Sequence, residues 1–149
     1  MSSLPRFSDL WSNYPGGSSE SAKAAVGGNL NLGWVTNTCA IRVCHALILS
    51  GHDIEGGAGI TTAKGGNGKR YIFRVADLDS YLRGAVGGPS TSVASPKPSH
   101  FGGQQGIICF EVSGWSDATG HFDLWNGSQC AGSEYFSQSH QAHLWACSG

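Results

Sequence analysis

The segment Cys39–Ser50 has the clearest pattern of hydrophobic and polar positions along the chain. Its hydrophobic positions recur at the i, i+3, i+4, i+7 spacing that places side chains on one face of a helix; they are Ala40, Val43, Cys44 and Leu47. Thr38 precedes the segment as a candidate N-cap, and Gly51 follows it as a stop signal. The pattern therefore predicts a helix with one buried face that begins at Cys39.

Apolar runs and alternating positions predict strands in the last third of the chain. A core strand is expected at Ile107–Val112, a second at His121–Trp125 and a short final strand at Ala142–Ala146. Asn126-Gly127 follows the second strand and is the commonest signal of a two-residue hairpin turn. Residues 114–120 are rich in glycine and polar side chains, so they are expected to form a turn.

Weaker signals fill the rest of the chain. A short helix is expected at Phe7–Trp11, a strand at Tyr71–Val75, and after it a helix that Asp77 caps. Residues 55–68 and 88–105 are expected to be loops. Helices thus come first and an antiparallel sheet last, which predicts an α+β fold with N-terminal helices packed on a small antiparallel sheet. The length suits a single domain over residues 1–149.

The composition excludes several classes of partner. Charged residues are only 13% of the chain and the formal net charge is −1, so there is no basic surface of the kind that binds nucleic acid. No apolar stretch approaches the roughly 20 residues that span a membrane. The N-terminus shows no signal peptide, since no cationic region is followed by an apolar one. A polar, weakly charged surface suits a partner rich in hydroxyl and amide groups.

The cysteine and histidine positions do not form a recognisable metal motif. The five cysteines are Cys39, Cys44, Cys109, Cys130 and Cys147. This odd number leaves at least one thiol unpaired, and no CxxC pair is present. If one thiol is catalytic, the other four allow up to two disulfides, with Cys130–Cys147 as one hypothesis, or they are simply buried thiols. His140 and His143 lack a full ligand set, so we expect no metal and no cofactor.

Cys39 stands where a cysteine can become a nucleophile. It lies in the first turn of the predicted helix, where free backbone N–H groups and the helix dipole favour negative charge. This setting favours the thiolate, and the same N–H groups could stabilise an oxyanion. A small buried cysteine in a helix explains the position equally well, so Cys39 alone decides nothing.

His121 adds a candidate base. Side chains alternate along a strand, so three residues share one face of the predicted strand, namely His121, Asp123 and Trp125. A histidine with an acid two residues later can pair with a cysteine at a helix start, as in a Cys–His amidase. A surface histidine in a polar strand is the simpler alternative for His121 taken by itself. Aromatic side chains could line a substrate groove or pack in the core; they are Trp34, Trp115 and Trp125.

Several short segments together resemble one known family, the fourth family of type VI secretion amidase effectors. The helix start Asn37–Arg42 resembles the family's nucleophile motif, and Lys69–Val75 with the helix after it resembles the segment that follows. Gly114–Ser116, Gly120-His121 and Leu124–Gly127 resemble the segment that carries the family's histidine. Each motif is weak alone, but they occur in order over most of the chain.

The resemblance implies a fold and an activity. It implies a papain-like or NlpC/P60-like fold, with Cys39 as nucleophile and His121 as base. The expected reaction is hydrolysis of the bond between γ-D-glutamate and meso-diaminopimelate in the stem peptides of peptidoglycan. The expected partners are the type VI secretion machinery, which would need no signal peptide, and a cognate immunity protein. The protein would be made in the cytoplasm and would act in the periplasm of a rival cell.

The third catalytic group departs from the family pattern. The family has an aspartate after the hairpin, near the cysteine that corresponds to Cys130, whereas this chain has no aspartate at 130–134. Asp123 could fill the role, although strand rise would place it about 7 Å from His121. Glu134 is a second candidate, and a backbone carbonyl or an amide side chain is a third. We favour Asp123, which makes the expected catalytic set Cys39, His121 and Asp123.

Two other functions remain open at this point. A housekeeping NlpC/P60-type hydrolase would remodel the producer's own cell wall, but it would normally carry a signal sequence or a wall-binding module. A non-catalytic module that binds glycans or peptides would use its Gly- and Trp-rich surface. This module predicts that alkylation of Cys39 leaves function intact, whereas the hydrolase predicts a reactive thiol.

Overall fold

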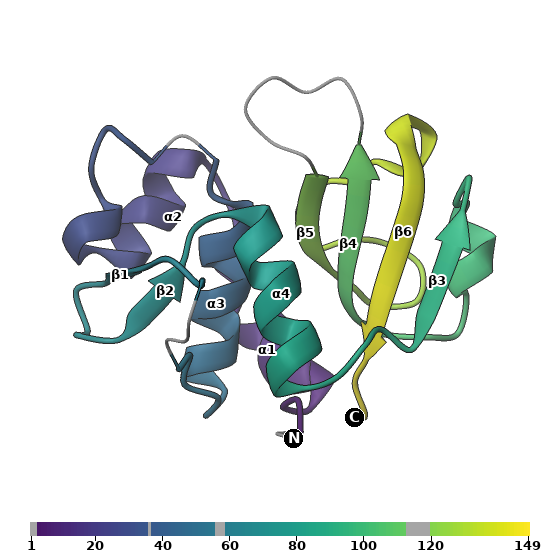
Figure 1. Ribbon diagram of the computed structural model, residues 1–149, viewed down its shortest axis with the longest axis horizontal. Helices are drawn as coiled ribbons and strands as arrows, with labels where there is room; N and C mark the ends of the chain where they lie inside the picture. Colours follow the sequence, from purple (N-terminus) through teal and green to yellow (C-terminus); the bar gives the residue numbers. More distant parts are fainter. Residues whose placement is uncertain (1–2, 36, 56–58, 113–119) are drawn as a thin grey trace.

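The computed structural model describes residues 3–35, 37–55, 59–112 and 120–149, which form a layer of helices beside an antiparallel sheet (Figure 1). The helices are α1 (Phe7–Asn13), α2 (Ser19–Val26), α3 (Cys39–Leu49) and α4 (Val75–Ala85). The main sheet has the order β3-β6-β4-β5. Its strands are β3 (Thr91–Ala94), β4 (Gly106–Val112), β5 (Gly120–Trp125) and β6 (Ser139–Ala146). This arrangement confirms the predicted α+β fold.

Short elements complete the chain. A separate antiparallel hairpin consists of β1 (Thr62–Lys64) and β2 (Arg70–Ile72), and it lies on the side of the helices away from the main sheet (Figure 1). Single 3-10 turns occur at Gly28–Leu30, Pro98–Phe101 and Phe136–Gln138. None of the helices in the described ranges is long and apolar enough to cross a membrane.

The helix predicted at Cys39 is confirmed, but its start is capped differently from the prediction. Thr38 occupies the N-cap position without capping the helix through its side chain. Asn37 takes over that role, because its Oδ1 atom accepts a hydrogen bond from the backbone N of Cys39 at 3.1 Å. The Thr38 hydroxyl instead accepts from Nε of Arg42 at 3.0 Å. The side chains of Asn37 and Thr38 therefore each accept a hydrogen bond from a residue in the first turn of the helix.

The second predicted helix begins earlier than its expected cap. α4 starts at Val75, and Arg74 holds the N-cap position in an extended conformation. The prediction that Asp77 caps this helix is therefore wrong, and the strand before it ends at Ile72 rather than Val75. Val75 already packs against the main core as a helical residue. Asp77 lies in the first turn, where a carboxylate is favourable to the helix dipole.

Three elements arise in segments expected to be loops or left unassigned. β1 lies within 55–68, β3 lies within 88–105, and α2 follows Gly17. The Asn126-Gly127 turn is longer than predicted, because Trp125 pairs with Cys130 across four residues. The Oδ1 atom of Asn126 accepts from two backbone N–H groups of that turn. The turn predicted at 114–120 lies outside the described residues, except for Gly120 at the start of β5.

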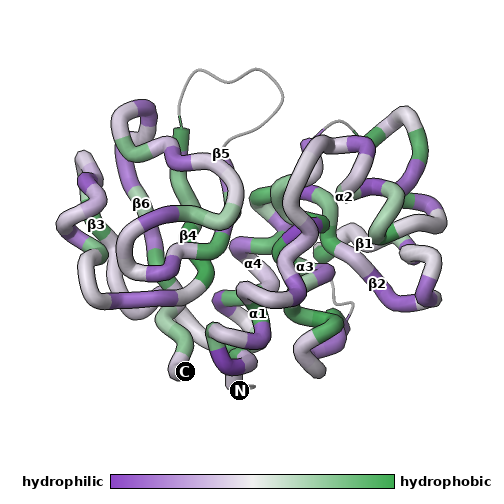
Figure 2. Tube along the Cα trace, turned by 180° about the vertical axis from the view of Figure 1, so that it is seen from behind, coloured by the Kyte–Doolittle hydropathy of each residue, from purple (hydrophilic) through white to green (hydrophobic). Residues whose placement is uncertain are grey.

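The two faces of the main sheet bury different hydrophobic clusters. The face toward the helices contributes Ile107, Cys109, Phe122, Leu124 and Trp145 to the larger cluster. The opposite face contributes Ile108, Phe110, Val112, Trp125, Ala142 and Leu144 to a smaller one. Figure 2 shows hydrophobic stretches along α3 and β4, while hydrophilic stretches follow many of the outer loops. The predicted alternation of β5 is confirmed, since Phe122 and Leu124 lie on one face and Trp125 on the other.

The packing of α3 against β5 positions the candidate site. β5 is the edge strand of the sheet nearest to the helices (Figure 1). The helix that begins at Cys39 therefore lies beside the strand that carries His121, which is the papain-like arrangement expected from the resemblance.

Candidate active site

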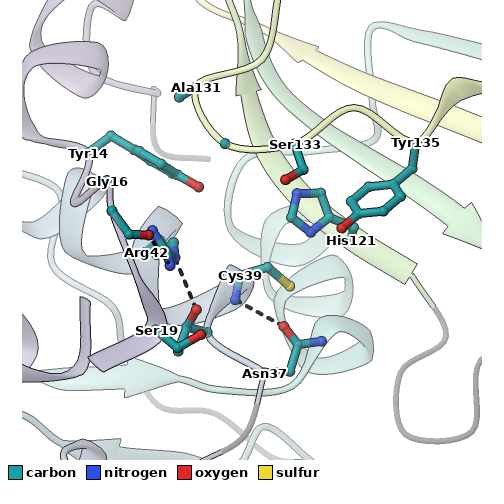
Figure 3. A pocket seen from close by; sticks show the side chains of 13 residues that line it. Tyr14, Gly16, Ser19, Asn37, Cys39, Arg42, His121, Ala131, Ser133 and Tyr135 are labelled. Atoms are coloured by element: carbon teal, nitrogen blue, oxygen red, sulfur yellow. Dashed lines mark hydrogen bonds between the residues drawn. The ribbon is translucent and has the colours of Figure 1, made fainter. Parts of the chain in front are cut away.

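A cavity of about 530 Å³ lies where the start of α3 faces β5 and the segment that follows it (Figure 3). Its lining comes from three parts of the chain: the α1–α2 connection with the start of α2, the start of α3, and β5 with the segment that follows it. The lining residues are Tyr14, Gly16, Gly17, Ser19, Asn37, Thr38, Cys39, Arg42, His121, Ala131, Gly132, Ser133 and Tyr135. The structure thus places Cys39 and His121, which are 82 residues apart in sequence, in one cavity.

Cys39 presents its thiol toward the His121 ring (Figure 3). It is the first residue of α3 and is only 4% exposed. Its backbone N–H, which the sequence suggested as an oxyanion donor, is engaged by Oδ1 of Asn37. That donor becomes available to a substrate only when the Asn37 side chain releases it.

His121 is held in place by two rings and a carboxylate. Its ring stacks on Phe110 with centroids 6.3 Å apart and meets Tyr135 edge-on at 4.7 Å. Its Nε2 atom lies 2.7 Å from Oδ2 of Asp123. Burial lowers the pKa of His121, but hydrogen bonds to Asp123 and Cys39 outweigh this effect and raise it from 6.5 to about 9. The imidazole therefore carries a positive charge at neutral pH.

Asp123 is completely buried and accepts four hydrogen bonds. Its Oδ2 atom accepts from His121 and from the backbone N of Ser133 at 2.9 Å. Its Oδ1 atom accepts from the backbone N–H groups of Leu124 and Gly132 at 2.8 and 2.9 Å. The separation of about 7 Å expected from strand rise is wrong for the side-chain atoms, because the two side chains lean toward each other along the strand.

The loop after β5 supports Asp123 instead of supplying its own acid. In the stretch 130–134, where the resemblance led us to look for an aspartate, the backbone N–H groups of Gly132 and Ser133 point at the Asp123 carboxylate. The Glu134 side chain is exposed and accepts from the backbone N of Cys130 at 3.4 Å. The acid that contacts His121 therefore comes from the strand, and the loop holds it.

Three further cavity residues were not predicted from the sequence. Tyr14 comes from the α1–α2 connection, and burial together with the negative charge of Asp123 raises its pKa well above its usual range. Arg42 lies one helical turn after Cys39 and could have been found from this i, i+3 spacing. Tyr135 follows the loop and packs on His121. Tyr14 and Tyr135 carry no local sequence signal, because only the fold brings them to the cavity.

The other cysteines, histidines and tryptophans that the structure describes are not among the residues that line the cavity. All five cysteines are unpaired, so the Cys130–Cys147 hypothesis is wrong; the two thiols lie in different hydrophobic clusters. Among the described residues no group of His, Cys, Asp and Glu could hold a metal. His143 contacts Glu111 through Nε2 and Ser92 through Nδ1, so it links three strands.

The two described tryptophans suggested for a substrate groove, Trp34 and Trp125, are not among the cavity-lining residues. Trp125 is fully buried in the smaller cluster and donates to the carbonyl of Phe101 at 3.0 Å. Trp34 is about half exposed and packs edge-on against Phe73. Trp115 lies outside the described residues.

Comparison with known proteins identifies close structural relatives. The sequence model of the family described as "Type VI secretion system (T6SS), amidase effector protein 4", or Tae4, matches residues 35–145. Tae4 from Salmonella typhimurium, solved in complex with the immunity protein Tai4 from Enterobacter cloacae, is 31% identical with a TM-score of 0.91; the match covers 96% of this chain and 99% of that one. Tae4 from Enterobacter cloacae is 33% identical with a TM-score of 0.89, over 98% and 99% of the two chains. A search of curated proteins gives no match.

Proposed function

The chain belongs to the Tae4 family of type VI secretion amidase effectors, and on this premise we propose that it is a cysteine amidase that cuts peptidoglycan between γ-D-glutamate and meso-diaminopimelate. One observation carries the catalytic assignment. His121 lies in one cavity with Cys39, whose thiol faces the imidazole ring (Figure 3), and His121 also hydrogen-bonds to the buried Asp123 carboxylate. The proposed nucleophile, base and orienting acid thus lie side by side in space, with the base in the middle, as this chemistry requires.

The proposed reaction has two steps. The Cys39 sulfur attacks the γ-carbonyl carbon of D-glutamate, and a C–S bond forms while the carbonyl π electrons move to oxygen. As the C–N bond breaks, His121 gives its proton to the departing amine of diaminopimelate, which leaves a thioester. Neutral His121 then takes a proton from water, whose oxygen attacks the thioester and releases the Cys39 thiolate. The free γ-carboxyl group of the product loses its proton to solvent.

The charge on His121 fits its role in the first step. A positively charged imidazole beside a cysteine favours the thiolate, and it already holds the proton that the leaving amine needs. Asp123 keeps the ring orientation fixed, since its own four hydrogen bonds leave the carboxylate little freedom to turn. In this proposal Asp123 is the third catalytic group, and it acts through His121.

The oxyanion of each step needs donors that face the attacked carbonyl. The backbone N–H of Cys39 is one candidate, provided that the substrate oxygen replaces Oδ1 of Asn37 as its acceptor. The Tyr14 hydroxyl is a second candidate, because Tyr14 lines the same cavity and its raised pKa keeps the proton in place.

Family membership also supports the biological setting. The Tae4 structures from two bacteria include complexes with the immunity protein Tai4. We propose that this chain likewise has a cognate immunity protein, is delivered by the type VI machinery, and acts on the wall of the recipient cell in the periplasm. Residues 1–149 would act as one catalytic domain. The housekeeping hydrolase and the binding module lose support, since the family consists of secreted amidases.

Digestion of purified meso-diaminopimelate-type peptidoglycan tests this proposal. The native protein should release fragments that end in D-glutamate, identified by mass spectrometry, whereas Cys39→Ala should release none. Cys44→Ala is a matched control, because Cys44 lies on the same helix but is buried away from the cavity. If Cys39→Ala cuts as well as the native protein, or if the native protein binds peptidoglycan without cutting it, the amidase assignment to Cys39 is wrong.

A further inference from the structure

In the part of the chain that the structure describes, the active-site cavity contains a cation without a carboxylate partner. Arg42 is the only lysine or arginine among the cavity-lining residues, and none of those residues is an aspartate or glutamate. None of the ion pairs between described residues includes Arg42. The buried carboxylate of Asp123 is already taken by four N–H donors. Among the described residues, no carboxylate therefore pairs with Arg42, whose side chain lies in the wall of the cavity.

The protein holds the Arg42 guanidinium rigidly but incompletely. Three of its N–H groups donate to neutral oxygens: Nε to the Thr38 hydroxyl, and the two terminal nitrogens to the carbonyls of Pro15 and Gly17 at 2.9 and 3.0 Å. A guanidinium has five N–H groups, so one on each terminal nitrogen is left for a ligand. Two donors in a fixed plane match the two oxygens of a carboxylate.

The position of Arg42 relative to His121 indicates which half of the substrate would lie beside Arg42. Figure 3 shows Arg42 and His121 on opposite sides of Cys39. His121 must face the leaving amine in order to protonate it, so the acyl half of the substrate extends toward Arg42. In the proposed substrate this half is γ-linked D-glutamate, whose α-carboxylate is free because the peptide bond uses the side-chain carboxyl group.

We propose that Arg42 binds the α-carboxylate of the D-glutamate residue and makes the enzyme selective for stem peptides in which this group is not amidated. This inference rests on the proposed function. It turns Arg42 into a substrate-binding residue that recognises the γ-linkage itself, since an ordinary α-linked residue carries no free carboxylate at this place. A stem with D-isoglutamine presents a neutral carboxamide there and loses the charge-assisted pair.

Two synthetic tripeptides test the proposal: L-Ala-γ-D-Glu-meso-diaminopimelate and the same peptide with an α-carboxamide on D-glutamate. For the native protein we expect kcat/KM to fall about 10- to 100-fold on amidation, the usual effect of losing a hydrogen-bonded charge. In Arg42→Gln the carboxylate peptide should be cut at about the rate of the amidated one, which removes the preference. Arg70→Gln removes the same charge from an exposed strand outside the cavity and should keep the preference.

The results separate a failure of the Arg42 proposal from a failure of the proposed amidase function. If the native protein cuts both peptides equally, or if Arg42→Gln still prefers the carboxylate, Arg42 does not read this group although the amidase function stands. If the native protein cuts neither peptide, the proposed bond is wrong and the inference falls with it. Arg42→Gln could misfold, because Arg42 also joins the α1–α2 connection to α3. The comparison of peptides on the native protein decides the selectivity without any variant.

Discussion

At the scale of single residues, the contact between Asp123 and His121 shows that the acid we propose as the orienting group comes from the same strand as the histidine. A side chain two residues from His121 on the same strand face contacts the imidazole directly, because both side chains lean along the strand. The loop that the family resemblance pointed to contributes only backbone N–H groups. The proposed chemistry requires a hydrogen-bond acceptor at the imidazole nitrogen that faces away from Cys39. Which part of the chain supplies this acceptor matters less.

The hydrogen bonds of His121 predict where activity is lost at high pH. Because the proposed first step uses protonated His121, and the pKa of this group is raised to about 9, kcat/KM should hold through neutral pH and fall as the pH rises through about 9. The hydrogen bond to Asp123 raises the pKa of His121 more than the hydrogen bond to Cys39 does. Asp123→Asn removes the negative charge of this partner. Burial then dominates, so the alkaline limb of the pH profile should move to lower pH.

The pH profile of Asp123→Asn is more informative than its rate alone. An amide nitrogen at this place would face a backbone N–H donor, so some loss of stability, about 1–3 kcal/mol, is expected as well. A fold defect lowers the amplitude of the profile without moving its limb. If the limb stays at the same pH in Asp123→Asn, Asp123 does not set the protonation of His121.

At the scale of elements, the site depends on the close approach of the loop 131–134 to β5. A Cβ atom on Gly132 would lie 2.6 Å from Oδ2 of Asp123 and 3.1 Å from the Tyr14 hydroxyl. Gly132→Ala should therefore push the carboxylate away from His121. We expect kcat to fall about 10- to 100-fold, the scale of a small misplacement of a catalytic group, with little change in KM.

A glycine elsewhere provides the control for this substitution. A Cβ atom on Gly84 in α4 would meet nothing within 4 Å. Gly84→Ala should keep full activity and gain up to about 1 kcal/mol of stability from better helix propensity. Full activity in Gly132→Ala would show that the loop does not hold Asp123 in the working enzyme.

The elements also show what the sequence could and could not predict. α3 was predictable because its buried side chains recur at the helical period, and β4 to β6 were predictable because they bury runs of mostly apolar side chains on both faces of the sheet. β1 and β3 have only three and four residues, none of them fully buried. β1 pairs with the equally short β2 and β3 pairs with the longer β6, so both depend on a partner strand rather than on a pattern of their own. Cys39 and His121 could be found from motifs, whereas Tyr14 is brought to the cavity by tertiary packing alone.

At the scale of the whole molecule, the two ends of the chain meet beneath the helical layer (Figure 1). The backbone N–H groups of Phe7 and Ser8, at the start of α1, donate to the carbonyls of Ser148 and Gly149 at 2.7 and 3.2 Å. Free N–H groups at a helix start need acceptors, and here the residues after β6 provide them. The sheet thus anchors α1 directly, in addition to the hydrophobic core.

This anchor connects the chain ends to the active site. α1 buries Phe7 and Leu10 in the main core and leads directly to Tyr14 and Pro15. Tyr14 lines the cavity, and the carbonyl of Pro15 holds the Arg42 guanidinium. A loosened α1 should therefore disturb the half of the cavity that we assign to the acyl part of the substrate, and leave His121 and Asp123 in place.

Removal of Ser148 and Gly149 tests this connection. The loss of two backbone acceptors should lower the free energy of unfolding by about 1–3 kcal/mol, measured by urea denaturation. KM for the carboxylate tripeptide should rise more than kcat falls, because substrate binding is affected while the catalytic groups are not. Ser148→Ala keeps both carbonyls and changes only an exposed side chain, so it should match the native protein in both measurements. If the shortened chain is as stable as Ser148→Ala, the hydrophobic core alone fixes α1 and the cavity wall does not depend on the chain ends.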